Sequence, residues 1–198
     1  MKRGALLGLI LLLAVAIAWL ALYWEPGKQD RGDRAGLPPG GDFALVSKAG
    51  PVELRALRGK LVVLFFGYTT CPDVCPTSLG VLSMALGGLQ AEELEQVQGL
   101  FISVDPERDT LERLHAYGEY FHPNILGVTG TTEQVAAIAE QYGAAYRKSG
   151  DTGGNKYLMD HTADLYLIDS AGRLHSRVRH GTPPAELLRQ LRQLLDEN

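Results

Sequence analysis

Apolar residues form one long uninterrupted run near the start of the chain. The run covers 20 residues without a charge, from Ala5 to Trp24, and follows Lys2 and Arg3. A helix of this length rises about 30 Å, which matches the hydrocarbon core of a bilayer. Aromatic residues suited to the membrane–water interface end the run. We predict that residues 1–24 form an uncleaved membrane anchor; the alternative, a cleaved signal peptide, usually has a shorter apolar core.

After this run the chain is polar and rich in Gly and Pro, from Glu25 to Gly41. Such a composition is typical of a flexible linker. From residue 42 to residue 198, short apolar runs alternate with segments of helical periodicity, which predicts one folded domain. The sequence therefore predicts an anchor over 1–24, a linker over 25–41 and a domain over 42–198.

Within the domain, strands are expected where short apolar runs are bounded by turn residues. These runs cover residues 43–46, 52–54, 61–66, 100–104, 125–128, 163–168 and 174–178. Helices are expected where apolar residues recur every three or four positions, the first behind Cys75 and the others behind the expected N-caps Asp109, Thr131 and Thr182. Residues 149–156 are expected to form a Gly-rich, charged loop.

The expected order is strand, helix, strand, helix, strand, helix, then an antiparallel hairpin and a final helix. Alternation of strands and helices predicts an α/β fold, an open sheet with helices on both faces. The closing hairpin and helix are typical of thioredoxin. The fold class predicted from the sequence is therefore a thioredoxin-like domain, preceded by an N-terminal transmembrane helix.

Composition narrows the function classes. The chain has 198 residues and 45% hydrophobic content, enough for one well-buried domain plus an appendage. Its net charge is -4, and acidic and basic residues are interspersed along it. Nothing in this pattern indicates binding to nucleic acid.

The chain contains two cysteines, Cys71 and Cys75. They lie between the apolar run 61–66 and a segment of helical pattern, so both thiols are expected near a helix N-terminus. Backbone N–H groups and the helix dipole favour a thiolate there, and the thiolate is both a nucleophile and a metal ligand. Their spacing of four residues would let them share one face of a helical turn. A local pair of this kind is more often chemical than architectural.

Two sulfur ligands leave most metal ions under-coordinated, so a third donor is expected. His161 lies at the lip of a central strand, in the loop that faces the cysteines of a thioredoxin-like sheet. The other four histidines have simpler explanations on the surface or at a helix end: His115, His122, His175 and His180. Two thiolates and one imidazole suit Cu(I), whereas structural zinc takes four ligands. Asp160 is a poor fourth ligand because it is adjacent to His161.

Several residues near the cysteines have a structural explanation beside a functional one. Asp73 is either an exposed turn residue or a participant in the chemistry. Asp105 and Asp109 can be explained as a turn residue and a helix cap. Tyr68 is a core residue by default and could also line the site. The sequence does not decide between these alternatives.

Three motifs together resemble the Sco/SenC family. They are Phe66–Pro76, which contains the Cys-x-x-x-Cys pair, then Val104–Thr110 and then Asp160–Thr162, in family order. The similarity extends over roughly residues 42–195 by eye, and the combination is far more specific than Cys-x-x-x-Cys alone. Met159 departs from the family pattern, in which an aliphatic β-branched residue is more usual, and we expect only a change of packing there.

The resemblance implies a membrane-tethered, thioredoxin-like protein that assists assembly of the binuclear copper centre of cytochrome c oxidase. Cys71, Cys75 and His161 would bind copper, as Cu(I) or as Cu(II), and the two cysteines would also form a redox-active disulfide pair. Asp105 would act near the site or at the partner surface. The implied partners are oxidase subunit II and a copper donor. The chain has no Arg-rich transit segment, which favours a bacterial inner membrane with the domain on its periplasmic side.

Two functions compete on these residues. A copper metallochaperone needs both cysteines and His161. A thiol–disulfide oxidoreductase that reduces the copper-ligand cysteines of the oxidase needs the cysteines but not His161. A peroxidase of the peroxiredoxin type is disfavoured, because its attacking thiolate is held by an Arg and a Thr at a different spacing. A purely structural disulfide that closes a short loop is the remaining alternative.

Overall fold

The computed structural model describes residues 12, 13, 19, 36–150 and 157–197. Backbone contacts divide the chain into two units, Met1–Gly36 and Leu37–Asn198. Across the described ranges, no helix combines the length and the apolar character needed to cross a membrane. Most of the predicted anchor and most of the predicted linker lie outside those ranges, so both stay predictions. All strands of the described residues belong to the second unit.

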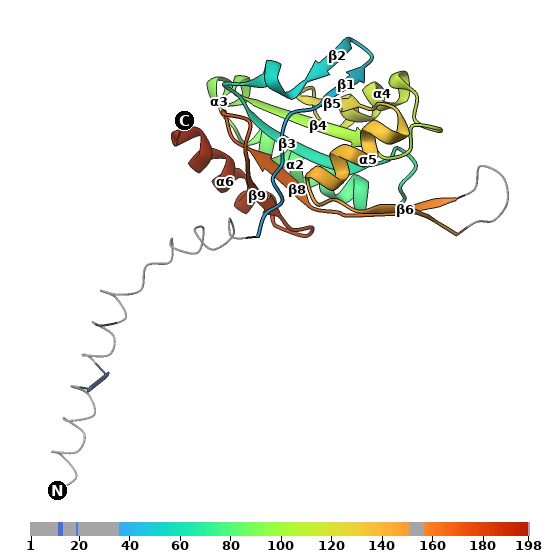
Figure 1. Cartoon of the computed structure of the whole chain (residues 1–198). Helices are drawn as coiled ribbons and strands as arrows, with labels where there is room; N and C mark the ends of the chain where they lie inside the picture. Colours follow the sequence, from blue (N-terminus) through green and yellow to red (C-terminus); the bar gives the residue numbers. More distant parts are fainter. Residues whose placement is uncertain (1–11, 14–18, 20–35, 151–156, 198) are drawn as a thin grey trace, which may run out of the picture. The chain divides into compact units, whose positions relative to one another are not determined.

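The centre of this unit is a five-stranded sheet in the order β5-β4-β3-β8-β9 (Figure 1). Strand β3 (Leu61–Gly67) occupies the middle and pairs in parallel with β4 (Val97–Ser103), which pairs in parallel with β5 (Ile125–Val128). On its other side, β3 pairs antiparallel with β8 (Leu165–Ile168), and β8 pairs antiparallel with β9 (Leu174–Val178). The mixed α/β sheet with a closing hairpin confirms the predicted thioredoxin-like domain, whereas the transmembrane helix of the predicted fold class is not shown by the described residues.

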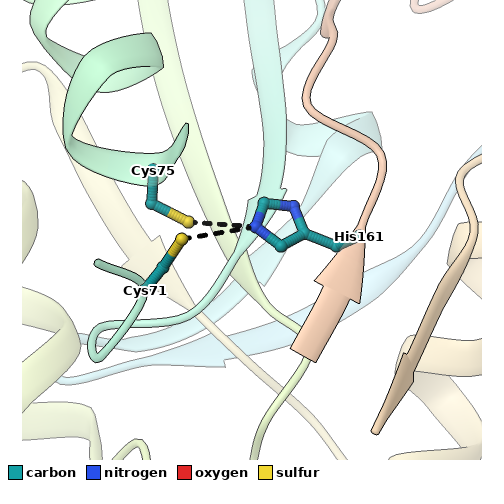
Figure 2. A group of neighbouring side chains, drawn as sticks. All are labelled: Cys71, Cys75 and His161. Carbon is teal, nitrogen blue, oxygen red and sulfur yellow. Dashed lines mark hydrogen bonds between the residues drawn. The ribbon is translucent and has the colours of Figure 1, made fainter. Parts of the chain in front are cut away.

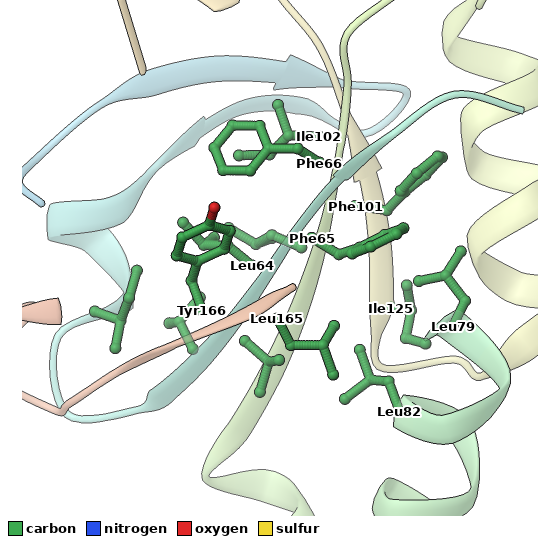
Figure 3. Packing of buried hydrophobic residues seen from close by; sticks show 14 of the residues in the cluster. Leu64, Phe65, Phe66, Leu79, Leu82, Phe101, Ile102, Ile125, Leu165 and Tyr166 are labelled. Atoms are coloured by element: carbon green, nitrogen blue, oxygen red, sulfur yellow. The ribbon is translucent and has the colours of Figure 1, made fainter. Parts of the chain in front are cut away.

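The central strand is buried along its whole length. No residue from Leu61 to Phe66 exposes more than 1% of its surface. A strand covered on both faces needs apolar side chains at every position, which explains its continuous apolar run. Part of the resulting core is drawn in Figure 3.

Successive side chains of a strand point to opposite faces, and ring contacts identify the helix on each face. Phe65 stacks with Phe101 at 6.2 Å between ring centroids, and Phe101 lies 5.4 Å from Tyr117 on helix α4 (Leu111–Phe121). Phe66, the next residue, lies 6.4 Å from Tyr142, which follows helix α5 (Thr132–Gln141). Helices therefore cover both faces, as predicted.

Helix α2 (Val74–Gly87) follows the loop at residues 68–73, which contains Cys71 and is called the cysteine loop below. The helix packs against the last helix, α6 (Pro184–Asp196). A Cβ added at Gly67, which points to the same face as Phe65, would meet the sulfur of Cys75 on α2. The α2 helix thus lies on the face of the sheet that carries Phe65 and Phe101. This placement puts the start of α2 directly over the end of β3.

Two small antiparallel ribbons accompany the sheet. The first, β1 (Ala44–Ser47) with β2 (Gly50–Glu53), confirms the predicted hairpin and leads into a short 3-10 helix, η2 (Leu54–Leu57). The second, β6 (Tyr146–Ser149) with β7 (Leu158–His161), was not predicted. Ser149 pairs with Leu158 rather than starting a loop, and residues 151–156 lie outside the described ranges. The mixed charged and apolar residues of this ribbon give no continuous apolar run.

One predicted helix start is confirmed and two are wrong. The Thr131 hydroxyl accepts from the Gln134 N–H and the Gln134 side chain accepts from the Thr131 N–H, which is the predicted capping box. Helix α4 is capped by Thr110, whose hydroxyl accepts from the Arg113 N–H at 3.3 Å, because Asp109 is buried and bonded elsewhere.

The final helix is not capped by Thr182 either. Its N-cap is Pro183, and the Thr182 hydroxyl instead donates to the Arg179 carbonyl at 2.8 Å. A short helix, α3 (Ala91–Glu95), was also missed, although Gln90 and Glu93 form a capping box at its start. Local sequence patterns thus located the starts of α4 and α6 only to within a few residues.

We expect Gly67→Ala to destabilise the fold. The added Cβ would lie 2.6 Å from the Cys75 sulfur and 2.9 Å from the Phe101 ring, so both must move. Overpacking of this kind costs about 1–3 kcal/mol. Urea denaturation of the full chain measures the loss. The matched control is Gly80→Ala within α2, where an added Cβ meets no atom within 4 Å and the gain in helix propensity is about 0.5–1 kcal/mol. Equal stability changes of the two variants would contradict this prediction.

Candidate metal centre

Three donor atoms from two segments that are distant in sequence meet beside the end of β3. Cys71 lies in the loop after β3, Cys75 lies in the first turn of α2, and His161 ends β7 (Figure 2). The His161 Nε2 atom lies 3.7 Å from the Cys71 sulfur and 3.3 Å from the Cys75 sulfur. All three donor atoms lie within 4.8 Å of one another, and the described part of the chain holds no second cluster of this kind among its His, Cys, Asp and Glu side chains.

The cysteines do not share a helical face as their spacing suggested. Helix α2 begins at Val74, so Cys71 lies in the loop before it and Cys75 lies within it. The loop still turns the two sulfurs toward each other, and both cysteines are free thiols. Cys75 is fully buried, whereas Cys71 keeps 8% of its surface exposed.

The imidazole of His161 is oriented for a ligand role. Its Nδ1 atom lies 3.0 Å from the Thr162 carbonyl oxygen, which can only accept, so Nδ1 carries the proton. The lone pair of Nε2 then faces the sulfurs, an arrangement common for histidines that bind metals. The rings of Phe65 and Tyr68 contact the imidazole edge to face, at 6.0 and 5.8 Å between centroids. These contacts restrict rotation of the ring.

The two thiols share one negative charge. The pKa of Cys71 falls from 9.0 to about 3, chiefly because the Cys75 thiol donates to its sulfur, and further because the backbone N–H groups of Asp73 and Cys75 donate to it. The hydrogen bond to Cys71 and burial raise the pKa of Cys75, which keeps its proton. The reduced pair is therefore one thiolate and one thiol at neutral pH, and a metal ion would displace the remaining proton.

The donor set fits a soft ion with few ligands. Two sulfurs and one imidazole nitrogen satisfy Cu(I) but leave structural zinc one ligand short. Asp160 does not supply the fourth ligand. Its carboxylate instead accepts from Arg147 and from Ser149, each at 3.0 Å. Asp160 is thus not part of the cluster of donor atoms.

The other histidines lie away from the cluster. His115 pairs with Glu119 on α4 at 3.2 Å, and His180 lies 3.0 Å from the Ser78 hydroxyl. His122 is the C-cap of α4, as expected, but burial lowers its pKa rather than favouring a cation there. His175 is half-buried on β9.

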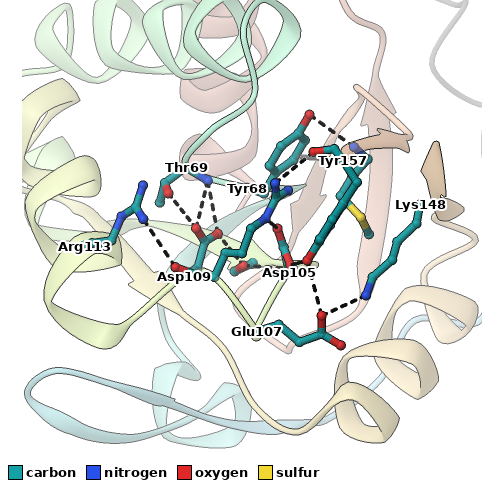
Figure 4. Close-up of polar contacts among 11 residues, drawn as sticks. Tyr68, Thr69, Asp105, Glu107, Asp109, Arg113, Lys148 and Tyr157 are labelled. Carbon is teal, nitrogen blue, oxygen red and sulfur yellow. Dashed lines mark hydrogen bonds and ion pairs between the residues drawn. The ribbon is translucent and has the colours of Figure 1, made fainter. Parts of the chain in front are cut away.

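Asp73 and Asp109, whose roles the sequence left open, differ in burial and in hydrogen bonding. Asp73 is exposed and precedes α2 without a side-chain bond to the helix. Asp109 is buried and accepts from the Thr69 N–H at 3.0 Å, from the Thr69 hydroxyl at 2.5 Å and from the Ser103 hydroxyl at 2.6 Å (Figure 4). It holds the loop that leads to Cys71. Sequence reasoning missed this role because the Asp109 pattern also matches a helix cap.

Tyr68 and Met159 connect the cysteine loop to β7. Tyr68 is buried, and its hydroxyl oxygen accepts from the Met159 N–H at 3.2 Å. Met159 is 6% exposed, so its side chain is part of the core. Both explanations that the sequence left open for Tyr68 therefore hold, because it is buried in the core and its ring contacts the His161 ring.

The fold and these donors define a thioredoxin-like protein with a candidate centre for a soft metal ion. A family model described as SCO1/SenC matches residues 32–196. The chain therefore belongs to the SCO1/SenC family, as its motifs predicted.

Individual relatives agree with this assignment. The mitochondrial SCO2 homolog of Bos taurus is 40% identical over 162 residues, which cover 78% of this chain and 61% of that protein. A SCO2-like protein of Rickettsia conorii is 34% identical, with coverage of 77% and 75%. The chain thus spans about three fifths of the length of the bovine relative.

Solved structures show the same fold. Apo Sco1 from Thermus thermophilus is 41% identical with a TM-score of 0.73, covering 79% of this chain and 92% of that chain. ScoI of Bradyrhizobium japonicum with copper bound is 38% identical with a TM-score of 0.72, covering 78% and 98%. Yeast Sco1 with copper bound is 30% identical with a TM-score of 0.73, covering 80% and 89%.

The lowered pKa of Cys71 predicts an unusual pH profile. Because its thiolate persists above a pKa of about 3, the ultraviolet thiolate absorbance of the reduced, metal-free protein should stay constant between about pH 5 and pH 8. In Cys75→Ala the main hydrogen-bond donor is lost, the Cys71 pKa rises, and the absorbance should increase with pH over this range. Cys75→Ser, which keeps a donor, is the control. A wild-type absorbance that increases steadily across this range would contradict the assignment.

Proposed function

We propose that this protein is a copper metallochaperone that assists assembly of the binuclear copper centre of cytochrome c oxidase. Cys71, Cys75 and His161 bind the copper ion as cargo. The observation that carries the proposal is the convergence of two sulfurs on an imidazole nitrogen whose lone pair faces them. The copper-bound structures of relatives from Bradyrhizobium japonicum and yeast support copper as the metal.

The cargo is handed over by ligand exchange. His161 is the non-sulfur ligand and comes from the separate β6–β7 ribbon, whereas the cysteines lie on one continuous segment. An incoming thiolate from the partner replaces the imidazole first, because thiolates bind Cu(I) more strongly. Cys75, which is fully buried, is the last ligand to leave.

The partner implied by this function is subunit II of the oxidase, and a separate protein donates the copper. Residues 1–24 anchor the protein in the inner membrane by a single span, and residues 25–41 form the linker. The domain then works on the periplasmic side, beside its membrane-bound partner. The length of the apolar run supports a single membrane span.

Anaerobic titration with Cu(I) against a chromophoric chelator tests the metal site. We expect the full chain to bind one Cu(I), and His161→Ala to weaken binding by more than about 100-fold, beyond the usual effect of an outer-shell residue. Cys71→Ala and Cys75→Ala should abolish tight binding. His115→Ala, which removes an imidazole paired with Glu119 on the surface, is the control. Full affinity in His161→Ala would refute the three-ligand site.

A second function is favoured by the thiolate at Cys71. A depressed pKa and partial exposure suit the attacking cysteine of a thiol–disulfide oxidoreductase. The Cys71 thiolate would attack a partner disulfide and release one partner thiol. Cys75, as its thiolate, would then attack the mixed disulfide, so the partner gains two thiols and this protein gains the Cys71–Cys75 disulfide.

Exchange with an oxidised peptide that carries the two copper-ligand cysteines of subunit II tests this second function. We expect reduced protein to reduce the peptide, Cys75→Ser to accumulate the mixed disulfide at Cys71, and His161→Ala to remain active. Mass spectrometry identifies the adduct. The complete absence of exchange by the wild-type protein would exclude the oxidoreductase activity and leave the metal function unaffected.

A further inference from the structure

A cluster of polar side chains contacts Tyr157 at the start of β7 (Figure 4). The Arg108 guanidinium lies 3.7 Å from the centre of the Tyr157 ring and 5.6 Å from that of Tyr68. It donates to the Tyr157 carbonyl at 2.8 Å and forms a short ion pair with Asp105. Asp105 in turn accepts from the Tyr157 hydroxyl at 2.6 Å. Tyr157 is thus held at its ring, its carbonyl and its hydroxyl.

These contacts of Tyr157 influence where the β6–β7 ribbon lies, because the ribbon is not part of the central sheet. Strands β6 and β7 form a separate two-stranded sheet. The position of His161 relative to the cysteines therefore depends on contacts made by side chains and loops, not on a ladder of backbone hydrogen bonds to β3. Tyr157 immediately precedes β7, and His161 is its last residue.

The turn at residues 105–109, which contains Asp105 and Arg108, also contacts the loop that carries Cys71. Asp105 and Arg108 contact Tyr157 on the ribbon, while Asp109 accepts two hydrogen bonds from Thr69 in the cysteine loop. The turn is fixed internally, because the N–H groups of Arg108 and Asp109 donate to the Asp105 carbonyl at 3.1 and 3.0 Å. One turn thus connects both segments that supply donor atoms.

We propose that Arg108 is a positioning residue that holds His161 against the cysteine pair before a metal ion arrives. Its role in copper binding rests on the function proposed above, whereas its role in placing the ribbon concerns the metal-free protein. A ligand that is already in place loses less conformational entropy on binding, so Arg108 raises affinity and slows release. A planar guanidinium can stack on the Tyr157 ring while its N–H groups donate to the Tyr157 carbonyl and to Asp105, whereas an ammonium group has no plane that could stack.

The choice of variant follows from burial. The Arg108 side chain is 13% exposed and that of Asp105 is 1% exposed. Removing the cation entirely would leave a buried carboxylate unpaired and could unfold the protein. Arg108→Lys keeps the charge and loses the planar contacts. Tyr157→Phe keeps the ring under the guanidinium and loses the hydroxyl that donates to Asp105.

The matched control is Arg147→Gln. Arg147 lies on the same ribbon and pairs with Asp160 at 3.0 Å, but its side chain is 80% exposed. It changes the charge of the ribbon without touching Tyr157. Exposed pairs of this kind contribute little to stability, so ribbon position should not change.

The first measurement uses the full chain, reduced and free of metal. Hydrogen exchange of the Met159 amide, which donates to Tyr68, reports how tightly β7 lies on the cysteine loop. We expect Arg108→Lys and Tyr157→Phe to accelerate it about tenfold, as for the loss of one hydrogen bond to a charged group. Nitrogen NMR of the His161 ring should change from one tautomer to a mixture. Unchanged exchange and an unchanged tautomer in both variants would overturn the proposal.

The second measurement separates positioning from general destabilisation. We expect Arg108→Lys to weaken Cu(I) binding about 10-fold to 100-fold, and to cause no further loss when His161→Ala is already present. An equal loss in both backgrounds would show that Arg108 acts without His161 and would overturn the proposal. If the wild-type protein binds no copper, the proposed function fails, and hydrogen exchange alone decides the placement of the ribbon.

Discussion

The contact between one imidazole nitrogen and two sulfurs depends on how a detached ribbon is held against the end of the central strand. The sulfur of Cys75 reaches this point because Gly67, the last residue of β3, has no side chain to exclude it. The imidazole reaches it because β7 is tied to Tyr68 and to the turn at residues 105–109. Neither approach is a consequence of sheet formation alone. The site is therefore a product of tertiary packing at the end of the central strand.

Electrostatics explain why metal binding and thiol chemistry are compatible on one site. The hydrogen bond between the sulfurs divides their protons unequally, so Cys71 is a thiolate and Cys75 a thiol. A thiolate is required for attack on a disulfide, and a thiolate is also a soft ligand of the kind that copper prefers. His161 distinguishes metal binding from disulfide exchange. Its Nε2 lone pair can supply a third metal ligand, whereas disulfide exchange involves the sulfurs alone. The protonation state of the reduced pair thus serves either reaction.

Much of this arrangement could be predicted from the sequence. The apolar run at 61–66 predicted the buried central strand, and the cysteine spacing with the Asp160–Thr162 motif identified the three donors that the structure brings together. The β6–β7 ribbon could not be predicted, because half-exposed strands with Arg, Lys and Asp lack clear periodicity. Asp109 was assigned to a helix cap, since a cap and a buried acceptor look alike in sequence. The role of Arg108 depends on contacts across 49 residues of chain, which no local pattern encodes.

The two cysteines differ in burial, and this difference affects how the pair responds to oxidants. Cys71 keeps a small exposed area, whereas Cys75 has none. A peroxide would therefore reach Cys71 first, and the resulting sulfenic acid would stand beside an intact thiol. Condensation of the two releases water and yields a disulfide, which cellular reductants can reverse. The enclosed sulfur thereby protects its neighbour from irreversible damage, and the centre can be restored without new protein synthesis.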